Sequence, residues 1–84
     1  MPYQVHIKRS AEKELDRLHA ERREQIAKWL LMLEENPRPP GVKKLHGQEA
    51  YRLRVGDYRI LYTIDDRGKR VTIYAVGHRR EVYR

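Results

Sequence analysis

The sequence contains no cysteine, so it forms neither a disulfide bond nor a zinc site built on thiolates. This absence leaves a reducing cytosol open as its environment. The chain also has no apolar run long enough for a signal peptide or a membrane-spanning helix. We therefore expect a soluble, cytoplasmic protein that has no membrane partner.

Metal-binding patterns, internal repeats and low-complexity segments are absent as well. The four histidines stand apart, and no two of them have the i, i+4 spacing that places two ligands on one face of a helix. We expect no metal and no cofactor. With 84 residues the chain has room for one domain, residues 1–84, whose core buries about 60–65% of the unfolded surface.

Acidic residues are scarce in the second half of the chain. Residues 1–40 carry 8 basic and 7 acidic residues, whereas residues 41–84 carry 11 basic and 5 acidic ones. Nearly all of the formal net charge of +7 therefore comes from the second half. Such a basic surface favours a polyanion, either a nucleic acid or an acidic protein. The alternative is a basic surface that only keeps the protein soluble.

The first half of the chain has the pattern of one strand followed by helix. Apolar and polar residues alternate over residues 3–7, and Ser10 stands where a helix N-cap is expected. Two apolar stripes at helical spacing follow, over residues 11–18 and 26–33, and the prolines of "NPRPP" end the helix. One long helix is compatible with this pattern. We favour an αα-hairpin that bends near Ala20, because a single rod would not bury both stripes against a small sheet.

The second half has the pattern of three strands. The segment "GVKKLHGQE" is expected to be a loop, and strands are expected over residues 51–55, 58–64 and 70–76. The connectors "GD" and "DDRGK" have the composition of hairpin turns. The sequence thus predicts an α+β fold of order β-α-α-β-β-β. Its three last strands form an antiparallel meander, and the helices cover one face of a roughly four-stranded sheet.

Strand alternation predicts which side chains face the helices. With a two-residue turn at residues 56–57, Arg54 lies opposite Arg59, and Arg52 shares their face. The opposite, apolar face must meet the helices, so the arginines lie on the open face of the sheet. On the inner face we expect Leu53, Val55, Tyr58, Ile60, Tyr62, Val71, Ile73 and Ala75. Thr72 and Tyr74 are expected beside the arginines.

Three arginines on one face of a small sheet are unfavourable, because like charges directly opposite each other destabilise a strand pair. One interpretation is a solvated face whose arginines pair with the carboxylates of Asp57, Asp65 or Asp66. Those carboxylates, however, are clustered at the hairpin turns. The other interpretation is a phosphate-binding platform, since guanidinium groups bind oxyanions in a bidentate manner.

The segments "KKLHG", "YRLRVGDYRILY" and "VGHRREVY" resemble those of the RelE/ParE toxins of type II toxin–antitoxin systems. The order of helices and strands expected above fits this family, so the resemblance spans nearly the whole chain. The RelE branch implies a ribosome-dependent endoribonuclease that cleaves mRNA in the A site of the 30S subunit without a metal. In that reaction the 2′-hydroxyl attacks the adjacent phosphate, leaving a 2′,3′-cyclic phosphate and a 5′-hydroxyl.

The resemblance also implies a set of site residues. RelE-type sites use two basic residues on one strand, an arginine on the next, an arginine after the last strand and a C-terminal tyrosine. The matching positions are Arg52 and Arg54, Arg59, Arg79, and Tyr83. Arg59 and Arg79 are expected to stabilise charge on the phosphate, and Arg52 and Arg54 to orient the RNA backbone. Tyr83 is expected to stack on a base or to donate a proton.

Two further groups of residues complete the candidate site. Arginine does not deprotonate in proteins, so His78 is the candidate general base; the alternative is a polar residue in a tight turn after Gly77. The cations expected to contact the RNA backbone are Lys43, Lys44, Arg80 and Arg84.

The family resemblance implies partners as well as a reaction. An antitoxin with an acidic or amphipathic segment is expected to wrap the toxin and inhibit it, and the ribosome and its mRNA are the expected targets. Two other functions stay open. One is a ParE-like poison of DNA gyrase on the same fold, and the other is a non-catalytic RNA-binding module that uses the same basic face.

Overall fold

The computed structural model describes residues 2–45 and 49–78. Within these residues the elements are β1 (Gln4–Ile7), α1 (Arg9–Asp16), α2 (Ala20–Glu35), β2 (Lys43–Lys44), β3 (Ala50–Val55), β4 (Tyr58–Asp65) and β5 (Arg70–His78). The predicted α+β class and the predicted order of elements are confirmed, with one additional short strand.

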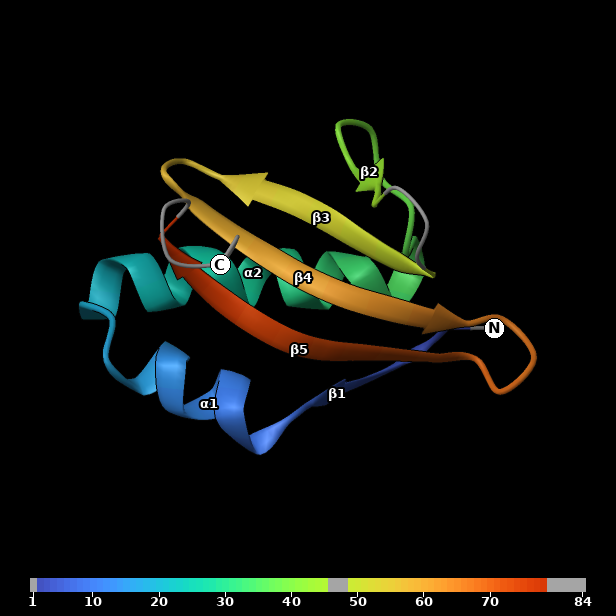
Figure 1. The fold of residues 1–84 in the computed structure, drawn as a ribbon, viewed down its shortest axis with the longest axis horizontal. Helices are drawn as coiled ribbons and strands as arrows, with labels where there is room; N and C mark the ends of the chain where they lie inside the picture. The colour runs from blue at the N-terminus through green and yellow to red at the C-terminus, as the bar shows by residue number, and fades with distance from the viewer. Residues whose placement is uncertain (1, 46–48, 79–84) are drawn as a thin grey trace.

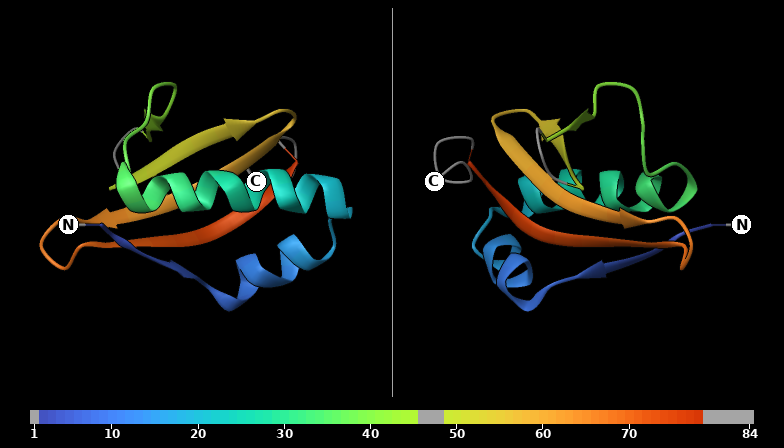
Figure 2. Two further views of the ribbon diagram at one scale, coloured as in Figure 1. Left: turned by 180° about the vertical axis from the view of Figure 1, so that it is seen from behind. Right: turned by 45° about the vertical axis from the view of Figure 1, so that its right-hand side comes forward.

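The strands form one twisted sheet in the order β1-β5-β4-β3-β2. β1 runs parallel to β5, and every other neighbouring pair is antiparallel. Seen from the front, the sheet covers α2, and α1 lies beside β5 (Figure 1). The view from behind shows both helices on one side of the sheet (Figure 2). Among the described residues, no helix lies on the other face of the sheet.

The described sheet has five strands, not four, because the expected loop after the prolines contains β2. Lys43 pairs with Arg52 and Lys44 with Tyr51, and the amide of Leu45 donates to the carbonyl of Ala50 at 2.8 Å. A strand of two residues is too short to produce an alternating pattern, which is why the sequence did not reveal it.

The predicted bend between two helices is confirmed, since α1 ends at Asp16 and α2 begins at Ala20. The expected N-cap at Ser10 is wrong, because α1 already begins at Arg9 and Lys8 occupies the cap position. The amide of Lys8 donates to the carbonyl of Ile73 at 2.9 Å. The chain therefore leaves the sheet at Lys8, and this contact sets the start of the helix. Neither helix of the described residues is long and apolar enough to cross a membrane.

The core lies between the sheet and the two helices. Its largest fully buried side chains are Tyr62, Ile26, Leu33, Ile60, Ile73, Val71 and Val76. The hydroxyl of Tyr62 donates to the carbonyl of Pro37 at 2.8 Å, and its ring stacks on Tyr51 with the centroids 5.9 Å apart. Burial raises the pKa of the Tyr62 hydroxyl, so this group stays a hydrogen-bond donor in the core.

A β-bulge in β5 changes the predicted inner face. Leu61 pairs with Ala75 whereas Tyr62 pairs with Ile73, so Tyr74 is the extra residue. The expectation that Ala75 faces the helices is therefore wrong: Val76, at 1% exposure, occupies the core instead. One inserted residue moves every later side chain of a strand to the opposite face, and strict alternation did not allow for it.

Candidate functional site

The face of the sheet that has no helix gathers basic side chains from three neighbouring strands. The register places Arg54 opposite Arg59 and Lys43 opposite Arg52, as cross-strand pairs that share one face. Directly opposite side chains have Cβ atoms about 4.5–5.5 Å apart. We call the four residues Lys43, Arg52, Arg54 and Arg59 the basic face. The register predicted from the two-residue turn is confirmed for all three arginines.

The arginines of the basic face differ in exposure. Arg54 is exposed and Arg52 is half-buried, whereas Arg59 is only 6% exposed. Among the described residues, Arg59 is the single charged residue that is buried. Arg52 and Arg59 both take part in polar or electrostatic contacts. Arg59 is therefore held in place, and Arg54 is open to a ligand.

Gly77 lies opposite Arg59 on β5. A glycine has no side chain, so nothing projects from β5 at this point onto the basic face, and the long stem of Arg59 has room beside it. The strand pattern predicted that the last strand ends at residue 76, before Gly77, whereas β5 continues to His78. A glycine within a strand often marks a place where another group approaches the backbone closely, so Gly77 was the signal in the sequence that could have predicted this arrangement.

The carboxylates at the β4–β5 turn bind groups outside the basic face. Asp66 accepts two hydrogen bonds from the guanidinium of Arg38, at 3.1 and 3.0 Å, and one from the hydroxyl of Tyr3 at 2.7 Å. Asp65 accepts the amide of Gly68 at 3.1 Å. The hydrogen bonds from Arg38 lower the pKa of Asp66 to about 2, so it stays ionised. These contacts argue against a face whose arginines are neutralised by Asp65 and Asp66.

His78 is not brought to the basic face. It pairs with Tyr58 across β4 and β5, and the two rings meet edge to face with their centroids 5.8 Å apart. It lines an open pocket of about 320 Å³ with Glu14 and Arg17 of the helix side. The interpretation of His78 as a residue in a tight turn is wrong, because it is the last residue of a strand. In this register its ring also lies on the side away from the arginines.

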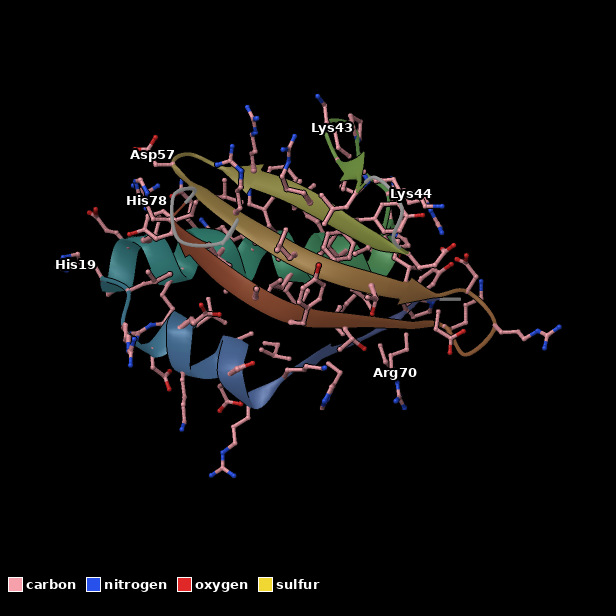
Figure 3. The ribbon with its side chains drawn as sticks, viewed as in Figure 1. His19, Lys43, Lys44, Asp57, Arg70 and His78 are labelled. Atoms are coloured by element: carbon pink, nitrogen blue, oxygen red, sulfur yellow. The ribbon has the colours of Figure 1, made fainter. Side chains whose placement is uncertain are left out.

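The two lysines of β2 separate onto different faces. Lys43 shares the face of Arg52, whereas Lys44 shares the face of Tyr51 and forms an ion pair with Glu49 at 3.7 Å. Figure 3 shows the two side chains leaving β2 in different directions. The other predicted site residues, Arg79, Arg80, Tyr83 and Arg84, lie outside the described residues.

The helix side supports the end of the sheet at which Arg54 and Arg59 lie. The guanidinium of Arg22, in α2, lies over the ring of Tyr58 at 5.1 Å and donates to Gln25 at 3.0 Å. A Cβ built on Gly56, which has a φ of +62°, would come within 2.8 Å of the same guanidinium. Arg22 thus packs against the turn between β3 and β4. Sequence reasoning missed this contact because it joins segments far apart in the chain.

The site offers cations and hydrogen-bond donors, which suit an anionic ligand. Within residues 2–45 and 49–78 no three histidine, aspartate or glutamate side chains come together as metal ligands would. What the basic face can do chemically is bind phosphate groups in a bidentate manner and stabilise negative charge that develops on them.

Comparison with known proteins identifies chains of the same architecture. Residues 5–83 match the family model described as the ParE toxin of the type II toxin–antitoxin system parDE. No match to the sequence was found among curated proteins.

Three of the solved structures that are similar to this chain match it over at least 90% of both chains. The archaeal RelE–RelB complex from Pyrococcus horikoshii has 30% identity and a TM-score of 0.86, covering 98% of this chain and 100% of that chain. The intact RelBE toxin–antitoxin complex of E. coli has 30% identity and a TM-score of 0.80, covering 90% and 95%. The isolated E. coli RelE toxin has 32% identity and a TM-score of 0.80, covering 96% and 90%.

Proposed function

The chain belongs to the RelE/ParE family of toxins from type II toxin–antitoxin systems, and from this premise we propose that it is an RNA-cleaving toxin. Its substrate is mRNA in the A site of the ribosomal 30S subunit, and its site of action is the cytoplasm. The observation that carries the proposal is the basic face, on which adjacent strands place Arg54 directly opposite Arg59.

The proposed reaction is an internal phosphoryl transfer. The ribose 2′-hydroxyl forms a bond to the adjacent phosphorus while the bond to the 5′-oxygen of the next nucleotide breaks. The attacking hydroxyl loses its proton and the leaving oxygen gains one, so the products are a 2′,3′-cyclic phosphate and a 5′-hydroxyl. Negative charge grows on the phosphate oxygens in the transition state, and fixed cationic donors accelerate such a step most.

The environments of the arginines suggest separate roles in this reaction. Arg59 is buried and faces Gly77, so it supplies a fixed donor for the charge that develops on the phosphate. Arg54 is exposed, and with Arg52 and Lys43 it orients the RNA backbone. We propose that Arg79 adds to the charge stabilisation and that Tyr83 stacks on a base or protonates the leaving oxygen. We assign no general-base role to His78, because the register of β5 places its ring beside Tyr58 on the helix side of the sheet.

We further propose that a small antitoxin inhibits the protein by covering the basic face. Two of the similar structures, one from Pyrococcus horikoshii and one from E. coli, are complexes of a toxin with its RelB antitoxin. An acidic segment would neutralise the arginines and exclude RNA. Leu31 and Met32 of α2 are the large hydrophobic residues left exposed among the described residues, and they offer apolar contacts to the same partner.

The proposal is tested by adding the purified protein to ribosomes that are translating a defined mRNA and by mapping the ends of the products. We expect cleavage within the A-site codon, with a 5′-hydroxyl on the downstream fragment and no dependence on added magnesium beyond what the ribosome needs. Intact mRNA after prolonged incubation would exclude the nuclease and leave an RNA-binding module.

A second candidate function has one observation in its favour, because the matching family model is described as the ParE toxin. A ParE-like toxin would poison DNA gyrase and would leave mRNA intact. The same preparation incubated with gyrase and supercoiled plasmid distinguishes the two. Gyrase-linked double-strand breaks without mRNA cleavage would favour the ParE-like activity.

A further inference from the structure

The last part of β5 lacks the strand neighbour that supports its first part. β1 pairs with β5 only as far as Ile7 and Ile73, and the amide of Lys8 makes the last backbone contact. The chain then turns into α1, which packs beside β5 in the place where a strand would continue (Figures 1 and 2). On this side, α1 contacts the segment of β5 that β1 does not reach.

Glu14 supplies one of these contacts from the second half of α1. Its Oε1 atom accepts the backbone amide of Val76 at 3.1 Å. An amide on the edge of a sheet ordinarily binds water, whereas here it binds a half-buried carboxylate, and hydrogen bonds to charged acceptors are stronger than those between neutral groups. Glu14 thus replaces the missing strand at one position.

This hydrogen bond is specific to the bulged register of β5. Successive residues of an antiparallel strand turn their amides alternately toward and away from the neighbouring strand. With the bulge at Tyr74, Val76 pairs with Ile60 and turns its amide to α1. A slip by one residue would remove the bulge and turn the amide of Val76 toward β4, where Glu14 does not reach it.

The register decides what lies opposite Arg59. In the bulged register that residue is Gly77, and Val76 is in the core. After the slip, Val76 would lie opposite Arg59, and a branched apolar side chain would stand on the basic face. His78 would move to the same face. Either change would alter the surroundings of the buried guanidinium.

We propose that Glu14 is a positioning residue for the RNA-cleaving site. It holds the end of β5 in the bulged register and so keeps Gly77 opposite Arg59. The link to cleavage rests on the function proposed above, whereas the link to the register does not. Glu14 touches neither the substrate nor the reacting atoms in this arrangement, and it acts through the backbone of Val76.

Three variants test this role, namely Glu14→Ala, Glu14→Gln and, as a matched control, Glu24→Ala on the exposed surface of α2. Amide hydrogen exchange of the free protein measures the contact directly. We expect the Val76 amide to exchange about tenfold faster in Glu14→Ala, while Glu14→Gln retains an acceptor and stays within about threefold of the wild type. Glu24→Ala should exchange as the wild type does.

Cleavage of ribosome-bound mRNA provides the second readout. We expect kcat to fall about tenfold in Glu14→Ala with KM little changed, and Glu14→Gln to restore most of the loss. Nuclear Overhauser effects between protons of Arg59 and Gly77 should weaken in the variants in which kcat falls. If the alanine variant does not fold, the glutamine variant provides the test. It should keep the Val76 amide protected and should still cleave mRNA, and loss of either property would contradict the proposed role of Glu14.

The outcomes separate this inference from the proposed function. Unchanged protection of the Val76 amide in Glu14→Ala would overturn the role of Glu14 whether or not the protein cleaves RNA. Faster exchange with an unchanged kcat would reduce Glu14 to a purely structural residue and would also overturn it. A wild-type protein that cleaves no RNA would refute the proposed function, and the exchange and NMR data would then decide the register claim alone.

Discussion

Arginine residues with different environments share the basic face. Arg59 is buried beside Gly77 and is held by contacts with the protein, whereas Arg54 projects into solvent opposite it. A fixed donor loses little entropy when it binds a phosphate, and an exposed donor is free to capture one. The pair therefore combines a site of charge stabilisation with a site of backbone contact, at the cost of repulsion between the two guanidinium groups.

Removing the charge of the exposed member of this pair, Arg54, should stabilise the fold. We expect Arg54→Gln to raise the free energy of unfolding by about 0.3 kcal/mol, because like charges directly opposite each other destabilise a strand pair. Urea unfolding at low salt measures the change, and added salt should diminish it by screening. A lower stability in Arg54→Gln at low salt would show that Arg54 is not repelled by its neighbour.

Asp66 should make stability depend on pH in the acid range. Its pKa is lowered to about 2 in the folded state by hydrogen bonds from Arg38 and Tyr3, against 3.8 for the unperturbed group. The contribution is therefore fully present above about pH 4 and is lost as the pH falls through the folded-state pKa near 2. In thermal unfolding scans from pH 5 to pH 2, Asp66→Asn should show a shallower decline of Tm than the wild type.

A parallel decline in the two proteins would mean that Asp66 gains nothing from Arg38 and Tyr3. Asp57→Asn is the matched control, since Asp57 is an exposed turn residue for which no such partner is described. It should follow the wild-type curve.

The helices and the β3–β4 turn support the end of the sheet at which Arg54 and Arg59 of the basic face lie. The turn at residues 56–57 sets the register of β3 and β4, and Arg22 of α2 packs against this turn and against Tyr58. Glu14 of α1 holds the end of β5. The helical hairpin thus contacts both segments that flank Arg59.

Gly56 is the position at which the turn depends on its residue type. Its φ of +62° is left-handed, so Gly56→Ala should lower the free energy of unfolding by about 1 kcal/mol. Gly56→Asn has the same Cβ but tolerates this backbone conformation better, and it should cost less than alanine. Denaturant titration of both variants checks the order. Equal losses would attribute the cost to the contact with Arg22 and not to the backbone.

Local features of the sequence predicted much of this arrangement. A two-residue turn leaves one register for the hairpin, so the pairing of Arg54 with Arg59 followed from the residues alone. The break near Ala20 followed from the need to bury two apolar stripes against a small sheet. These features depend on contacts within a hairpin or on the size of the core.

The features that were missed depend on contacts between distant segments. The bulge at Tyr74 places Val76 in the core, where it pairs with Ile60, and alternation along β5 alone favoured Ala75. The same bulge directs His78 to the helix side. β2 was missed because two residues make no pattern. In each case a tertiary contact decided between local arrangements that the sequence permits.

Across the whole molecule, the charge is divided between two sides. The two helices carry 5 basic and 7 acidic residues, whereas residues 41–84, which contain β2 to β5, carry 11 basic and 5 acidic ones. A surface of this kind attracts RNA over a distance and repels other cations. It also implies that an inhibitor must supply negative charge.

Binding to RNA should therefore weaken steeply with salt. With about five phosphate contacts and a slope of about −0.7 per contact for single strands, affinity should fall about a hundredfold between 50 and 200 mM salt. Fluorescence anisotropy with a labelled, uncleavable single-stranded RNA measures this slope. A flat response would place the RNA on a surface other than the basic face.

The most direct measurement is the single-turnover rate of mRNA cleavage on the ribosome by Arg54→Ala and Arg23→Ala. Both variants lose one exposed arginine, but Arg54 lies on the basic face and Arg23 on α2, which covers the opposite side of the sheet. We predict that the rate falls about 10²-fold in Arg54→Ala, because the RNA backbone is no longer oriented for attack, and that it stays near the wild-type value in Arg23→Ala. Equal rates in the two variants would contradict the claim that the uncovered face of the sheet carries the reaction.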